Sequence, residues 1–117
     1  MSSFGSYIRD RREAMRAKDK TMSLRQVALR ISVEPAFLSK VERDLTPPPS
    51  ETKVIALADV LGEDPDLLLA MAGKVSSDLL QIIKTRPQLF GEVLRQLKEQ
   101  PDHAILHVVR QVTDGDW

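Results

Sequence analysis

The feature that most constrains the fold of this chain is an apolar pattern near the N-terminus that keeps a helical interval, stops, and then resumes. Its positions are Leu24, Val27, Ala28 and Ile31 before the interruption, and Leu38 and Val41 after it. Such spacing marks one face of an α-helix. The interruption at Ser32 and Val33 leaves room only for a tight turn. We therefore predict two short helices, over about residues 23–31 and 34–42, packed against each other.

Local signals mark the starts of both helices. Ser23 is a good N-cap, and Gln26 can complete a capping box. Glu34 precedes Pro35, and proline is tolerated in the first helical turn because its missing N–H would have no partner there. Ala28 is small, so we expect it where the two helices approach closely.

The rest of the N-terminal part also predicts helices and no strand. Three consecutive prolines at 47–49 cannot supply helix N–H donors and hold the chain extended. The expected elements are a helix over about residues 3–17, a loop over 18–22, a helix that Ser50 caps and Gly62 ends, and a helix through Ala72 that Asp64-Pro65 opens and Gly73 follows.

The net charge of zero conceals an asymmetry along the chain. Residues 1–50 hold ten Lys and Arg against six Asp and Glu, a net of +4. Residues 51–75 carry two bases and five acids, and residues 76–117 carry five bases and six acids. A basic N-terminal half suits a protein that binds DNA phosphates. Solvated helix faces are the alternative interpretation, so the charge alone does not decide.

Residues from about Phe4 to Ala72 resemble the domain of the lambda-repressor-like, or Xre, family of bacterial and phage regulators. The matching parts, which agree in order and spacing, are Ile8, Arg9 and Arg12 on the first helix, the helix pair, Leu-Ser-Lys-Val-Glu-Arg at 38–43, and Pro49-Ser50 before Leu-Ala-Asp-Val-Leu-Gly at 57–62. The resemblance implies an all-α fold, with a five-helix DNA-binding domain over residues 1–73 and a C-terminal helical segment over residues 74–117.

Three positions depart from the family pattern. Ser32 and Asp44 stand where glycine is usual, so we expect both to adopt a left-handed backbone. Leu24 stands where relatives often place a glutamine that touches a phosphate. Arg25 or Ser23 would have to replace that contact.

The resemblance implies a sequence-specific transcriptional regulator whose third helix enters the major groove of double-stranded DNA. The residues expected to face the bases are Glu34, Pro35, Ala36, Ser39 and Lys40. The residues expected to contact phosphates are Arg9, Arg12, Ser23, Arg25, Arg43, Thr46 and Lys53. Few of the first set are good readers of base edges, so DNA shape should contribute to specificity. We expect Phe37 to be partly buried and Glu42 to pair with an arginine of the first helix.

Residues 74–117 predict three short amphipathic helices, which begin near Ser77, Pro87 and Pro101. The apolar residues expected to form a homodimer interface are Leu79, Ile83, Leu89, Phe90, Val93, Leu94, Leu97, Ile105 and Val109. A two-fold dimer would place two recognition helices in successive major grooves of a palindromic operator, as a repressor requires. The alternatives are that the segment folds back on a monomeric domain, or that it binds a protein encoded by an adjacent gene. In that last case the chain would act as an antitoxin, or would sequester a toxin or a regulatory metallopeptidase.

No catalytic, metal or cofactor site is predicted, so we do not expect an enzyme. The chain has no cysteine, and His103 and His107 are its only imidazoles. Their spacing suits a metal, but the residues between them are Ala, Ile and Leu, and no cysteine completes a ligand set. No apolar run approaches the length of a membrane span, and the N-terminus lacks the pattern of a signal peptide. We expect a cytoplasmic protein.

Overall fold

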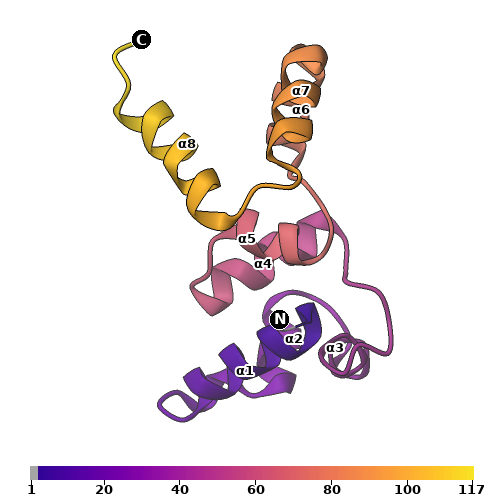
Figure 1. Ribbon diagram of the computed structural model, residues 1–117. Coiled ribbons are helices and arrows are strands. Elements are labelled where there is room, and N and C mark those ends of the chain that lie inside the picture. Colours follow the sequence, from indigo (N-terminus) through magenta and orange to yellow (C-terminus); the bar gives the residue numbers. More distant parts are fainter. Residues whose placement is uncertain (1–2) are drawn as a thin grey trace. The chain divides into compact units, whose positions relative to one another are not determined.

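The computed structural model describes residues 3–117, and this part of the chain is helical with no strand, as predicted. The chain divides into two compact units, Met1–Ser76 and Ser77–Trp117. The first contains α1 (Phe4–Arg16), η1 (Lys20–Met22), α2 (Leu24–Arg30), α3 (Pro35–Glu42), α4 (Glu51–Leu61) and α5 (Pro65–Met71); the second contains α6 (Ser77–Thr85), α7 (Pro87–Leu97) and α8 (Asp102–Asp114) (Figure 1). The predicted loop at 18–22 therefore includes a short 3₁₀ turn, η1.

The core of the first unit is built from the apolar positions that set the helical pattern in the sequence. Helix α1 contacts α3 and α4, α2 contacts α3 and α4, and α4 packs on α5. The buried apolar side chains are Phe4, Ile8, Met22, Val27, Ala28, Ile31, Leu38, Val41, Val54, Leu57, Ala58, Leu61, Leu68 and Leu69. Burial of one such leucine or valine contributes about 1.5–3 kcal/mol, so this core holds α2 and α3 in place.

Two of the expected helix starts differ from the prediction. Ser50 occupies the N-cap position of α4, but its side chain makes no capping hydrogen bond. Ser77 is the first residue of α6 rather than the residue before it. At the opposite ends, Gly62 and Gly73 have φ of 66° and 74° and terminate α4 and α5 as predicted, since glycine adopts this conformation without strain.

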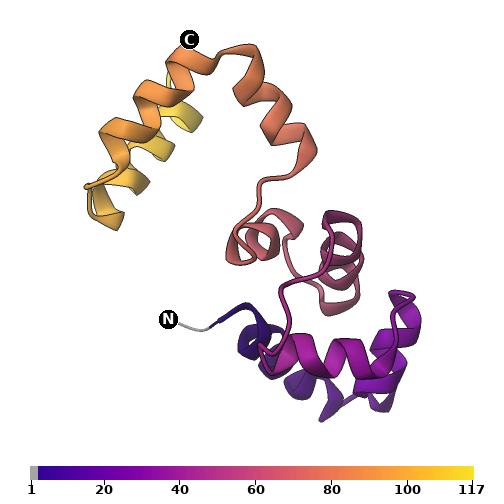
Figure 2. The same ribbon diagram turned by 90° about the vertical axis from the view of Figure 1, so that its right-hand side faces the viewer.

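The second unit has no buried residue over Ser77–Trp117. Helices α6 and α7 contact each other, and short connections join the three helices (Figure 2). Large apolar side chains remain in solvent, among them Leu89 at 66% and Leu94 at 59% exposed. None of the described helices has the length and apolar character needed to cross a membrane.

Candidate nucleic-acid interface

Helices α2 and α3 form the predicted pair joined by a tight turn. Ser23 caps α2, because its Oγ accepts a hydrogen bond from the Gln26 N–H at 3.3 Å. The return bond from the Gln26 side chain is not among the described hydrogen bonds, so half of the capping box is formed. Ala28 is fully buried where α2 meets the rest of the domain. A larger side chain there would force the helices apart.

The turn between α2 and α3 uses the left-handed conformation expected of Ser32, whose φ is 59°. The N–H of Val33 donates to the carbonyl of Ala28 at 3.0 Å, which satisfies the end of α2. From α4, the Nζ of Lys53 donates to the Ser32 carbonyl at 3.3 Å. Lys53 thus has a partner in the turn, a role that the sequence analysis did not assign to it.

Helix α3 presents the side chains expected to face DNA. Glu34, Ala36 and Lys40 are exposed, and Pro35 and Ser39 are half-buried. Phe37 is half-buried and packs on the core, as predicted. The opposite face of the helix carries Leu38 and Val41, which are buried. The helix is therefore anchored on one side and open to a ligand on the other.

A buried ion pair joins α1 to α3. Arg12 Nε donates to Glu42 Oε2 at 2.7 Å, and Arg12 Nη2 donates to Glu42 Oε1 at 2.9 Å. The two side chains are only 5% and 4% exposed. Arg12 Nη1 also donates to the Met22 carbonyl, and Nη2 to Glu13. The hydrogen bond to Glu42 raises the pKa of Arg12, against the effect of burial, so the guanidinium stays charged.

This ion pair confirms the prediction that Glu42 binds an arginine of the first helix. It also corrects the expectation for Arg12, which we had assigned to a phosphate. The guanidinium is buried, and all three of its nitrogens donate within the domain. We therefore treat Arg12 as a residue that fixes α3 on α1, and we do not retain it as a phosphate contact.

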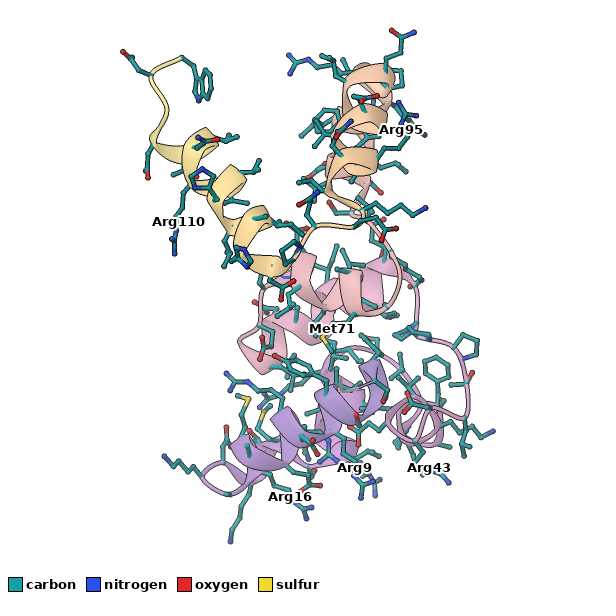
Figure 3. The ribbon with its side chains drawn as sticks, in the orientation of Figure 1. Arg9, Arg16, Arg43, Met71, Arg95 and Arg110 are labelled. Carbon is teal, nitrogen blue, oxygen red and sulfur yellow. The ribbon has the colours of Figure 1, made fainter. Side chains whose placement is uncertain are left out.

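A small pocket opens beside the ion pair, where α1, α2 and α3 meet. Its volume is about 150 Å³, and its lining residues are Arg9, Arg12, Glu13, Leu24, Ser39, Glu42 and Arg43. Arg9 and Arg43 are exposed, and their side chains project to the same side of the domain (Figure 3). Sequence reasoning named most of these residues, but it did not predict that they surround one pocket, because helices distant along the chain form it.

The other candidate phosphate contacts lie around this face. Arg25 is exposed, and Ser23 and Thr46 are half-buried. The described side chains of Arg9, Arg25, Lys40 and Arg43 form no ion pair within 4.0 Å, and Arg43 Nε donates to the Ser39 carbonyl at 3.3 Å. Several positive charges therefore remain uncompensated near the exposed face of α3.

A comparison with protein-family models matches residues 3–71 to the family described as helix-turn-helix domain. The chain belongs to this family. In the helix-turn-helix domain seen here, α2, the Ser32 turn and α3 are the motif itself. Such domains bind DNA and are typical of transcription regulators rather than of enzymes. No curated protein and no solved structure matches the chain significantly.

The histidines of the second unit do not add a metal centre to this picture. His103 and His107 lie on α8. Over residues 3–117, no group of three or more His, Cys, Asp or Glu is arranged to hold a metal ion.

Proposed function

We propose that this protein is a sequence-specific transcriptional regulator of the lambda-repressor-like, or Xre, type, and that it acts as a dimeric repressor on a palindromic operator. The observation that carries the proposal is the pocket flanked by Arg9 and Arg43, directly beside the exposed face of α3. Together they offer an anion site and a helix surface that can enter a major groove.

The pocket suits a DNA phosphate. Its volume of about 150 Å³ exceeds the share of about 30 Å³ that one water takes in the liquid, so a phosphate group fits. Guanidinium groups bind phosphate with charge-assisted hydrogen bonds, and Ser39 adds a hydroxyl. Ser23, Arg25, Thr46 and Lys53 complete the proposed phosphate contacts.

Base recognition is assigned to the outward residues of α3. Lys40 can donate to guanine O6 and N7, Ser39 can bond several base edges, and Ala36 can meet a thymine methyl group. Glu34 and Pro35 lie at the N-terminal end of the same face. Because this set contains one strong donor, we expect DNA shape to supply part of the specificity.

Dimerisation is assigned to the second unit. Its helices are amphipathic, yet none of its residues is buried. Each leucine or isoleucine that leaves water on association would contribute about 1.5–3 kcal/mol, so a second copy of the same segment can stabilise the folded helices. A two-fold pair also delivers the half-site spacing of about one DNA turn.

The alternative partner for these helices is a protein from an adjacent gene, such as a toxin or a regulatory metallopeptidase. It is favoured by the same exposed apolar faces. A chain that is monomeric alone and forms a stoichiometric complex with the neighbouring product would support this alternative over the homodimer.

DNA binding is tested by selecting duplexes from a random-sequence pool and measuring affinity by fluorescence anisotropy at several salt concentrations. Arg9→Ala should reduce the salt slope by about 0.9, the value for one phosphate contact on duplex DNA. Arg11→Ala is the matched control, since Arg11 lies on the same helix but pairs with Glu63 at 2.9 Å. Equal slopes for the two variants would refute the assignment of Arg9.

A further inference from the structure

Four helices of the first unit end in the same backbone motif, with one residue in the left-handed conformation. The residues are Ser32, Asp44, Gly62 and Gly73, with φ between 58° and 74°. At the end of α3, the Asp44 N–H donates to the Val41 carbonyl at 3.1 Å, and the Leu45 N–H donates to the Lys40 carbonyl at 2.9 Å. Glycine is the residue that fits such a motif without strain. Asp44 therefore has to be explained by its side chain.

The carboxylate of Asp44 reaches the first turn of α1. Its Oδ1 accepts a hydrogen bond from the Gly5 N–H at 3.1 Å, and its Oδ2 accepts one from the Ser3 hydroxyl at 2.6 Å. The N–H groups of a first helical turn have no partner inside the helix, and that end of the helix favours negative charge. Ser3 is also the local cap, because its Oγ accepts from the Ser6 N–H. Asp44 thus completes the cap of α1 from a distant part of the chain.

Gly5 shows how closely the two elements approach. A Cβ atom at this position would collide with the Val41 carbonyl and with the Asp44 carboxylate. The first turn of α1 therefore lies directly on the last turn of α3. We refer to the contacts of Asp44 with Ser3 and Gly5 as the α1–α3 clamp.

The clamp lies beside residues assigned to DNA. Arg43 lines the phosphate pocket, and Thr46 follows Asp44 by two positions. A carboxylate here opposes DNA electrostatically, whereas glycine would relax the backbone and carry no charge. We propose that Asp44 is a positioning residue for DNA binding: by holding the start of α1 on the end of α3, it fixes the segment from Arg43 to Thr46 for contact with the phosphates. This inference rests on the proposed DNA-binding function.

Two substitutions of Asp44 separate the clamp from the charge. Asp44→Asn and Asp44→Gly remove the same negative charge, and both residues tolerate the left-handed conformation. Asparagine keeps an oxygen that can accept from the Gly5 N–H, whereas glycine keeps none. The difference between the two variants therefore reports the clamp alone. Ser3→Ala, which removes one of the two bonds and leaves the backbone of Asp44 untouched, is a milder third variant.

The measurement is the affinity for a duplex selected by the wild-type chain, at a temperature where circular dichroism shows every variant folded. We expect Asp44→Gly to bind about two- to thirty-fold more weakly than Asp44→Asn, the range for residues that modulate binding without touching the ligand. Ser3→Ala should fall between wild type and Asp44→Gly. The salt slope should be equal in the two Asp44 variants, because no phosphate contact is removed.

The outcomes distinguish this inference from the proposed function. If the wild-type chain binds DNA and Asp44→Gly binds as tightly as Asp44→Asn, the positioning role is overturned while DNA binding stands. Should Asp44→Gly fail to fold, the comparison of Ser3→Ala with wild type decides in the same way. Absence of DNA binding by the wild-type chain refutes the proposed function and, with it, this inference.

Discussion

The buried ion pair between Arg12 and Glu42 gives the most quantitative prediction about the stability of the domain. In Glu42→Ala, the guanidinium would lose bonds of 2.7 and 2.9 Å and remain at 5% exposure. Removing one partner of a buried ion pair costs about 3–5 kcal/mol, because the other charge stays buried. Arg12 keeps Glu13, which is 45% exposed, as a weaker partner at 3.1 Å. We therefore expect a loss near the lower limit, about 3 kcal/mol.

Such a loss is large for a domain of this size. Small domains have a free energy of unfolding of about 5–15 kcal/mol, and a change of about 1 kcal/mol shifts Tm by about 4–8 °C. The Tm of Glu42→Ala should therefore fall by about 12–24 °C. Thermal and urea unfolding followed by far-ultraviolet circular dichroism measure both quantities.

Two controls decide whether the buried charge is the cause. Glu13→Ala removes a half-exposed partner of the same arginine and should cost less than about 1 kcal/mol. The double variant Arg12→Met with Glu42→Leu replaces both charges by apolar groups and should be more stable than Glu42→Ala alone. The reasoning is refuted if Glu42→Ala loses less than about 1 kcal/mol, as an exposed ion pair would, or if the double variant is the less stable of the two.

Three further predictions concern specificity, assembly and pH. Lys40→Ala should relax base preference at one operator position, at a cost of about 1–3 kcal/mol for the preferred base; an equal loss on all sequences would contradict its role as a base contact. Leu94→Glu should weaken self-association at least about 100-fold by sedimentation, whereas Leu67→Glu on α5 should not; a dimer unchanged by the first substitution would exclude α7 from the interface. The hydrogen bond from the Tyr7 hydroxyl to the Glu63 carboxylate raises the pKa of Tyr7, so its stabilising contribution is present below pH about 10 and is lost as the pH rises through the raised value. The difference in unfolding free energy between wild type and Tyr7→Phe should accordingly be constant from pH about 7 to 9 and shrink at higher pH, and a constant difference throughout would rule out this bond as the cause.

The sequence predicted the parts of the fold that depend on local rules. The apolar interval from Leu24 to Val41 identified the buried faces of α2 and α3, because helical spacing determines which side chains share a face. The left-handed conformations of Ser32 and Asp44 were also predictable, since each follows the end of a helix where glycine is usual.

The parts that the sequence did not predict depend on contacts between distant residues. Arg9 and Arg12 lie three residues apart on α1, and only the docking of α1 on α3 determines that Arg12 is buried while Arg9 is exposed. The bond of Asp44 to Gly5 joins residues 39 positions apart and leaves no local pattern. In the second unit, amphipathic spacing predicts that a face becomes covered, but it carries no information about which surface covers it.

The dependence of DNA affinity on salt tests the proposed function most directly. Arg9, Arg25 and Arg43 provide three cationic phosphate contacts per protomer, or six in a dimer, so the logarithm of the binding constant should fall with the logarithm of salt concentration with a slope of about −5. Fluorescence anisotropy on a selected duplex between about 50 and 200 mM salt covers the range in which such a slope is measurable. A slope of this size, on a duplex with two half-sites about one helical turn apart, is the predicted result. A slope near zero, or no binding to any duplex, would contradict a DNA-binding regulator built on this helix-turn-helix.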